Sequence, residues 1–133
     1  MDKDFIPYEQ ALALKELGFD EPCFNAYDEY GKFIYKNKFI KIWNSRIIKI
    51  NNINPTIKIC SLPLYQQVFR WFRDNYQLEH KILRDSYGCR YQITKVTSTS
   101  LEDIDCKGQY SNTSYEEAEL SCLKKLIEIV KTT

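Results

Sequence analysis

The stretch PLYQQVFRWFRDNYQLEHKILRDSYGCRYQITKV, residues 63–96, decides the fold of this chain. Its first part predicts a helix over about Pro63–Tyr76, because large apolar side chains recur at helical spacing while polar ones face the other way. The apolar side comprises Tyr65, Val68, Phe69, Phe72 and Tyr76. Its second part predicts a hairpin, since Lys81–Arg84 and Arg90–Val96 flank the turn-forming residues Asp85–Gly88. Helix and antiparallel strands are therefore expected in one chain.

A helix is predicted on the N-terminal side of this stretch by a start signal that recurs. The pattern Tyr-[Glu/Gln]-[Glu/Gln]-[Ala/Val] begins at Tyr8, Tyr65 and Tyr115. The helix that opens at the first copy is predicted over about Pro7–Leu17. It is expected to end at Gly18, with Phe19 placed to fold back on the last helical turn.

A third helix is predicted over about Tyr115–Lys131. Ser114 and Glu117 form a capping box at its start, in which each side chain can satisfy a backbone N–H. Its apolar positions recur at helical spacing over a wide face, which is typical of a central packing helix. They are Ala118, Cys122, Leu123, Leu126, Ile127, Ile129 and Val130.

Short β-branched and aromatic runs between the first two helices predict strands separated by turns. These runs are Cys23–Tyr27, Lys32–Tyr35, Phe39–Trp43, Arg46–Ile50 and Ile57–Cys60. Strands joined by short turns pair antiparallel, so we expect a single α+β domain over residues 1–133. In it, three helices pack mainly on one face of an antiparallel sheet. The Ser/Thr-rich stretch 94–100 is expected to be a flexible connector.

The composition limits the class of protein. With 133 residues, 44% hydrophobic and 14% aromatic, the chain can form one globular domain. Its N-terminus lacks a signal peptide's basic and apolar segments, and no apolar run approaches the ~20 residues of a membrane span, so we expect a cytoplasmic protein without membrane contact. An odd number of cysteines cannot all pair within the chain, and we expect reduced, buried thiols. The cysteines are Cys23, Cys60, Cys89, Cys106 and Cys122.

Charge is segregated along the chain. Between Tyr30 and Arg73 there are nine Lys or Arg residues and no Asp or Glu, whereas residues 1–29 carry a net charge of −6 and residues 74–133 of −2. Cations beside aromatic rings on one strand face are a common platform for single-stranded nucleic acid, and a nucleotide would need a smaller version of the same chemistry. We therefore predict a basic and aromatic patch. Its members are Lys36, Lys38, Phe39, Lys41, Trp43, Arg46 and Lys58.

A second interpretation of the same residues involves no ligand. Lysines on exposed strands protect sheet edges from aggregation, and Phe39 or Trp43 can pack beneath a loop.

No catalytic, cofactor or metal signature stands out in the sequence. The glycine-rich phosphate-binding motifs and the nucleophile motif of hydrolases do not occur. His80 follows Glu79, but neighbours on an extended strand point to opposite faces, and we expect a solvated turn histidine. The acidic run Glu102–Asp105 lacks the glycine and the terminal glutamate of a calcium loop. We predict a protein that is not an enzyme, with no cofactor and no metal.

Three segments of the chain carry a family resemblance. They are Phe5–Phe24, the helical residues Phe69–Arg73, and Tyr115–Glu119 with the helix that follows. Together they resemble a group of short proteins encoded by Bacteroidota phages and prophages. The resemblance implies a phage or mobile-element origin, hence the cytoplasm of a bacterial host, and it carries over no catalytic or binding residue.

The expected function follows from these observations. Without recognisable chemistry but with one basic, aromatic region, the chain is expected to be a small non-catalytic binding module that contacts a host or phage macromolecule, such as a protein. The alternative is nucleic-acid or nucleotide binding through the basic, aromatic patch.

Overall fold

The computed structural model describes residues 4–19, 21, 23, 25–27, 30, 33–34, 60–107 and 114–132. Within these residues the chain has three helices and two three-stranded antiparallel sheets, which confirms the α+β class. The strands are thus divided between two sheets. The chain separates into two compact units, Met1–Leu64 and Tyr65–Thr133, called here the N-terminal and C-terminal units. The assignment of residues 1–133 to a single domain stays a prediction. Among the described helices, none is both long enough and apolar enough to cross a membrane.

The N-terminal unit combines one helix with a small sheet. Its elements are α1 (Tyr8–Glu16), β1 (Asn25–Tyr27), β2 (Phe33–Ile34) and β3 (Cys60–Leu62). β1 lies in the middle of the sheet and pairs antiparallel with both β2 and β3. The pairing of β1 with β2 confirms the antiparallel pairing predicted for the runs Cys23–Tyr27 and Lys32–Tyr35. α1 packs against β3, and the Ile6 N–H donates to the Pro63 carbonyl oxygen at 3.1 Å. Among the described residues of the unit, the buried ones are Ile6, Ala11, Leu14, Phe19, Cys23, Leu62 and Pro63.

The end of α1 confirms the predicted stop signal. Gly18 has a φ of +95°, in a region of backbone conformation that residues with a Cβ rarely adopt. The Phe19 N–H reaches back to the Leu14 carbonyl oxygen at 3.0 Å, and the Gly18 N–H reaches the Lys15 carbonyl oxygen at 3.1 Å. This pair of bonds is a Schellman motif, and the burial of both Leu14 and Phe19 provides its apolar contact.

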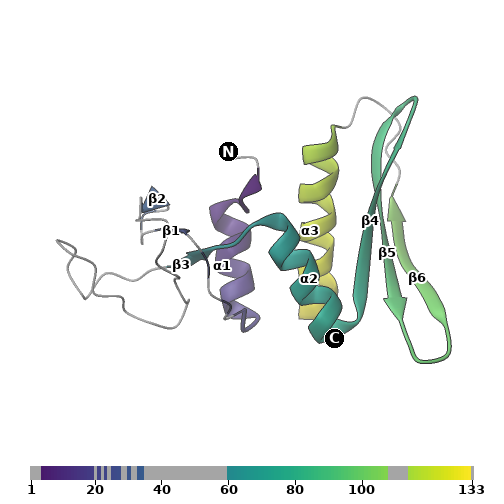
Figure 1. The fold of residues 1–133 in the computed structure, drawn as a ribbon, viewed down its shortest axis with the longest axis horizontal. Coiled ribbons are helices and arrows are strands. Elements are labelled where there is room, and N and C mark those ends of the chain that lie inside the picture. Colours follow the sequence, from purple (N-terminus) through teal and green to yellow (C-terminus); the bar gives the residue numbers. More distant parts are fainter. Residues whose placement is uncertain are drawn as a thin grey trace. The chain divides into compact units, whose positions relative to one another are not determined.

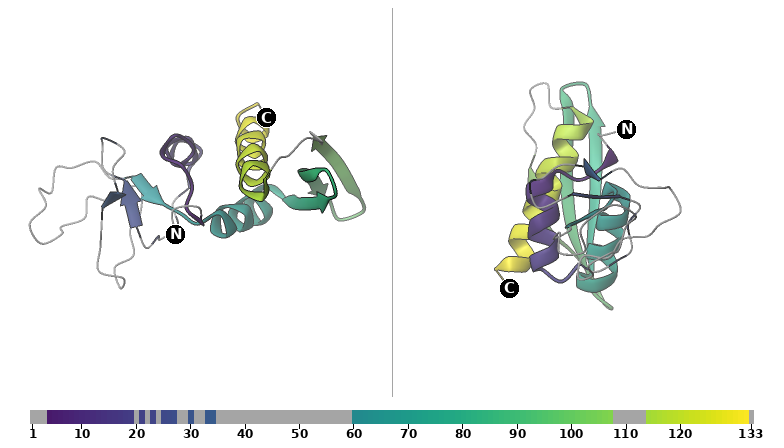
Figure 2. Two further views of the ribbon diagram at one scale, coloured as in Figure 1. Left: turned by 90° about the horizontal axis from the view of Figure 1, so that it is seen from above. Right: turned by 90° about the vertical axis from the view of Figure 1, so that its left-hand side faces the viewer.

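The C-terminal unit places two helices on one face of a sheet. Its elements are α2 (Tyr65–Tyr76), β4 (Leu78–Asp85), β5 (Gly88–Val96), β6 (Leu101–Lys107) and α3 (Tyr115–Lys131). β5 is the central strand and pairs antiparallel with β4 and β6. α2 packs on β4, α3 packs on β4 and β5, and the two helices contact each other. Figures 1 and 2 show both helices on the same side of the sheet. For this sheet, packing of helices on one face is as expected.

Alternation along β5 explains why the helices cover that face. Cys89, Tyr91 and Ile93 are buried, while Arg90 and Gln92 between them are half-exposed. α3 packs against β5, while α2 packs against the neighbouring strand β4. The helix residues buried in this unit are Tyr65, Val68, Phe69, Trp71 and Phe72 from α2 and Ala118, Cys122, Leu123, Leu126 and Ile127 from α3. Four members of the predicted aromatic stripe are therefore core, whereas Tyr76 is half-buried, and Trp71, outside that stripe, is buried with the four.

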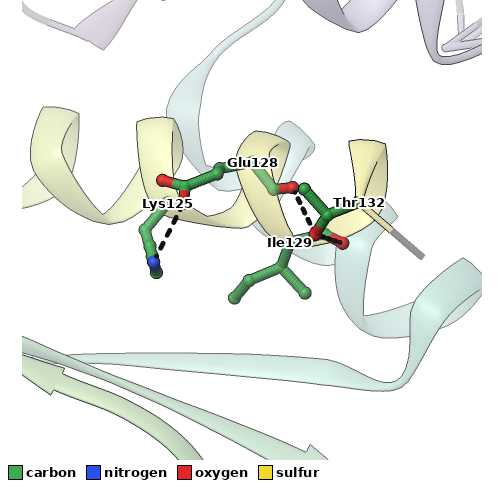
Figure 3. Close-up of polar contacts among 4 residues, drawn as sticks. All are labelled: Lys125, Glu128, Ile129 and Thr132. Carbon is green, nitrogen blue, oxygen red and sulfur yellow. Dashed lines mark hydrogen bonds and ion pairs between the residues drawn. The ribbon is translucent and has the colours of Figure 1, made fainter.

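At both ends of α3, side chains form hydrogen bonds with terminal backbone groups of the helix. At its start, the Ser114 Oγ accepts the Glu117 N–H at 3.2 Å, which confirms the Ser114 half of the predicted capping box. At its end, the Thr132 Oγ1 lies 3.1 Å from the carbonyl oxygens of both Glu128 and Ile129 (Figure 3). Lys125 and Glu128 form an exposed ion pair one turn earlier. These contacts stabilise a helix whose terminal backbone groups would otherwise depend on water.

One sequence prediction for this unit is wrong, and one strand of it was not predicted. Residues 94–100 are not simply a connector, because β5 continues to Val96 and the remaining residues form a tight turn. In that turn the Thr97 N–H donates to the Ser100 carbonyl oxygen at 2.9 Å. The turn leads directly into β6, which includes the acidic run 102–105 that was not predicted as a strand. Pairing with β5 supplies the backbone hydrogen bonds that override the low β propensity of acidic residues.

Candidate functional site

The predicted basic and aromatic patch lies outside the described residues. Its seven members, Lys36, Lys38, Phe39, Lys41, Trp43, Arg46 and Lys58, all fall between residues 34 and 60. The patch stays a prediction, and the candidate site must be sought in the described part of the chain.

A groove at one end of the C-terminal unit is the candidate site. It is formed by Arg84–Cys89, at the turn between β4 and β5, and by Ser114–Glu116, at the start of α3, and is called here the Tyr87 groove. The space it encloses is about 500 Å³. Figure 1 shows the β4–β5 turn and the first turn of α3 at the same end of this unit. A space of this size falls within the range of small-ligand and side-chain pockets.

Local sequence builds the hairpin side of the groove. Asp85 Oδ1 accepts the Tyr87 N–H at 2.9 Å, which closes the turn through a side chain. Gly88 follows with a φ of +137°, so that β5 can run back along β4 in the register that pairs Asp85 with Gly88. The turn leaves the Tyr87 side chain 67% exposed. A large ring is thus held in solvent by a well-defined turn.

The start of α3 builds the other side. Because Ser114 caps the helix, the backbone direction at Tyr115 is set, and the Tyr115 side chain is 49% exposed. Partial burial raises the pKa of the Tyr115 phenol, and the neighbouring Glu119 carboxylate and Cys89 raise it further. The phenol is therefore neutral at physiological pH, and its surroundings disfavour another negative charge.

Cys89 is the buried member of the groove lining. It is 4% exposed, and it is the first inward-facing residue of β5 after the turn. Cys23, Cys89 and Cys122 form no disulfide and are buried, as predicted for these three. The side chains of Cys60 and Cys106 lie outside the described residues. A small buried side chain of β5 therefore contributes to the groove lining.

His80 is not the solvated turn residue that the sequence predicted. It lies in β4, which begins three residues earlier than the predicted strand, and its imidazole stacks on the Phe69 ring with centroids 3.7 Å apart. Burial and, second, the positive charge of Arg73 lower the His80 pKa to about 4. Glu79 is exposed, which agrees with the expectation that the two neighbours face opposite ways. His80 is a neutral packing residue at neutral pH.

The described residues contain no group of three or more His, Cys, Asp or Glu side chains that could hold a metal ion. The functional groups that line the Tyr87 groove are two phenols, a guanidinium, two carboxylates, two serine hydroxyls and the sulfur of Cys89. Such groups bind and orient a ligand through charge, hydrogen bonds and ring contacts.

Sequence reasoning identified the parts of this groove but not the groove itself. The turn Asp85–Gly88 and the helix start at Ser114 were both predicted. The available signal was a tyrosine inside a polar turn and another at the first residue of a helix, two positions that leave large rings exposed. Comparison with protein-family models, with curated proteins and with solved structures finds no match to this chain.

Proposed function

We propose that this chain is a small non-catalytic α+β binding module that contacts a host or phage macromolecule. The observation that carries the proposal is the Tyr87 groove, where two strongly exposed tyrosines line one concave surface. Exposed large rings are costly to leave in water, and tyrosine is enriched where proteins bind partners because its ring packs while its hydroxyl hydrogen-bonds. The phage or prophage origin and the cytoplasm of the bacterial host belong to this proposal through the family resemblance.

A comparison of captured partners tests the proposal. Immobilised wild-type chain is compared with the double variant Tyr87→Ser, Tyr115→Ser in lysate of the bacterial host, with captured molecules quantified by mass spectrometry. Tyr30→Ser is the matched control, since Tyr30 is 79% exposed and lies in the N-terminal unit. We expect at least one partner to be lost in the double variant and retained in the control. Identical partner sets for all three proteins would remove the Tyr87 groove from consideration.

Nucleic-acid or nucleotide binding is the second candidate function. The stretch from Tyr30 to Arg73, with nine cations and no acidic residue, favours this function because phosphate groups need counter-charges. The predicted patch also offers Phe39 and Trp43 for base stacking. A charge-reversal variant at Lys41 and Lys58, with Trp43→Ala, is compared with wild type for binding of labelled oligonucleotides over a range of salt concentrations. Phosphate binding weakens steeply as salt rises. Salt-insensitive binding, or none, would count against this candidate.

A further inference from the structure

Charge at the Tyr87 groove favours a cationic ligand. Asp85 and Glu116 line the groove, and Glu119 lies close enough to Tyr115 to raise its pKa. Among the described residues, Arg84 is the one cation in the lining, and the amino end of α3 adds about half a positive charge through the helix dipole. The carboxylates outweigh these positive contributions.

An anion is the competing ligand, since a helix start and an arginine can together bind phosphate. At α3, however, the Glu117 N–H is already satisfied by the Ser114 Oγ at 3.2 Å. Glu116 and Glu117 also sit in the first turn, where their charges compensate the helix dipole. An incoming phosphate would therefore meet carboxylates where it needs free N–H groups. The groove is better suited to a cation.

The rings determine what kind of cation fits. Tyr87 and Tyr115 present exposed aromatic surface from two different elements, and ring faces attract ammonium and guanidinium groups. The Asp85 carboxylate, although it accepts the Tyr87 N–H, keeps further acceptor sites on its two oxygens. A long side chain with a cationic end satisfies both features, because its methylene stem covers apolar ring surface while its end meets the carboxylates.

We propose that the Tyr87 groove binds a Lys or Arg side chain from a basic, extended segment of a partner protein. The rings of Tyr87 and Tyr115 lie beside the cation, and Asp85 and Glu116 supply its counter-charges. This inference rests on the proposed binding function and names the chemistry of the partner.

Labelled peptides test the inference directly. The probe is acetyl-Gly-Lys-Gly-Lys-Gly-amide, compared with the same peptide containing Glu in place of Lys and with labelled oligothymidylate, all by fluorescence anisotropy at low salt with the full chain. We expect the Lys peptide to bind and the Glu peptide to bind at least tenfold more weakly. Tighter binding of the Glu peptide or of oligothymidylate, weakened by Tyr87→Ala, would overturn the inference in favour of an anionic ligand at this groove.

Matched variants locate the binding. Tyr87→Ala is expected to weaken the Lys peptide about twofold to fivefold, whereas Tyr87→Phe keeps the ring and should match wild type. Glu116→Gln is expected to weaken it about twofold to fivefold, in a manner that salt removes. Glu128→Gln is the control, because it makes the same charge change at the other end of α3 (Figure 3). Equal affinity in all four variants would overturn the assignment to this groove.

Two further outcomes distinguish failure of this inference from failure of the proposed binding function on which it rests. If the Tyr87, Tyr115 double variant loses a captured partner but the Lys peptide does not bind, the binding module stands and the cationic ligand is wrong. If sedimentation shows self-association of the chain that Glu116→Gln abolishes while the peptide fails to bind, a second copy replaces the partner protein as occupant.

Discussion

The two sheets of this chain are built on different scales. In the C-terminal unit, β4, β5 and β6 have 8, 9 and 7 residues, and consecutive strands are joined by short turns. In the N-terminal unit, β1, β2 and β3 have only 3, 2 and 3 residues, and β1 pairs with a strand far along the chain, with Tyr27 opposite Cys60. The C-terminal sheet has long strands that are close together in the sequence. The N-terminal sheet has short strands, two of which are far apart in the sequence.

This difference teaches where each sheet obtains its stability. Long strands joined by tight turns form many backbone hydrogen bonds, and closing their short loops costs little conformational entropy. A three-residue pairing between segments far apart in the chain gains few hydrogen bonds, so it depends on the side-chain packing around it. In the N-terminal unit that packing comes from α1 against β3, with Leu14, Phe19 and Leu62 almost fully buried.

The largest expected effect is on the C-terminal core. Phe72 is fully buried in α2, and Phe72→Ala is expected to lower the free energy of unfolding by about 3–5 kcal/mol, because a large cavity remains where the ring was. Urea denaturation measures the loss, and hydrogen exchange followed by mass spectrometry shows where protection falls. We expect the fall in residues 65–132.

Leu14→Ala is the partner of that experiment in the N-terminal unit. Leu14 is fully buried, and the change is expected to cost about 2–5 kcal/mol. Protection should fall mainly in α1 and β3. Equal loss of protection throughout the chain for either variant would contradict the division into two units and show that they unfold together.

Protonation of His80 comes next in size. Its pKa is lowered to about 4 in the folded chain from an ordinary value of 6.5, so between these values the unfolded chain binds more protons. Stability is therefore complete above about pH 6.5 and falls as the pH drops toward 4, by on the order of 1–2 kcal/mol once solvent screening is allowed for. Urea midpoints at several pH values measure it.

His80→Phe separates this effect from the other titrating groups. It keeps a ring to stack on Phe69 but has no group to protonate. The variant should be less sensitive than wild type between pH 6.5 and 4. An unchanged pH dependence would show that His80 is not the group responsible.

The helix start at the Tyr87 groove gives a smaller effect. Ser114→Ala removes the acceptor of the Glu117 N–H and is expected to cost about 1 kcal/mol. Ser114→Asp restores an acceptor and should recover most of the loss. Thermal denaturation compares the variants. A neutral Ser114→Ala would mean that water satisfies the amide equally well.

The features that could be predicted from sequence are those set by neighbouring residues. The Ser114 cap, the Gly18 stop, the aromatic stripe of α2 and the Asp85–Gly88 turn each depend on side chains a few positions apart. Such contacts form whenever the local segment forms. For the same reason the α+β class followed from the order of helices and hairpins.

The features that could not be predicted depend on tertiary contacts. β6 contains acidic residues that disfavour strands, and pairing with β5 decides its conformation. His80 became a packing residue because α2 places Phe69 against it. The Tyr87 groove joins Arg84–Cys89 with Ser114–Glu116, which no local pattern connects. The basic and aromatic patch between Lys36 and Lys58 stays a prediction.

The ends of α1 and α2 provide the finest comparison between the units. Both end at a residue with positive φ, but α1 uses Gly18 whereas α2 uses Gln77, with a φ of 57°. Gln77→Gly is expected to stabilise the chain by roughly 0.5–1 kcal/mol, because glycine adopts this conformation without strain from a Cβ. Thermal denaturation measures the gain.

Gly18→Ala makes the opposite change at the end of α1, because it replaces glycine with a residue that has a Cβ at a position of positive φ. A Cβ at Gly18 would meet no atom within 4 Å, so any loss comes from backbone strain rather than from a clash. We expect a loss of about 1 kcal/mol. Opposite signs for the two variants would show that backbone conformation alone distinguishes the two helix ends. The Gln77 Nε2 donates a hydrogen bond to the Asp74 carbonyl oxygen at 3.4 Å. If Gln77→Gly destabilises the chain instead, this hydrogen bond stabilises the fold by more than the backbone strain at Gln77 destabilises it.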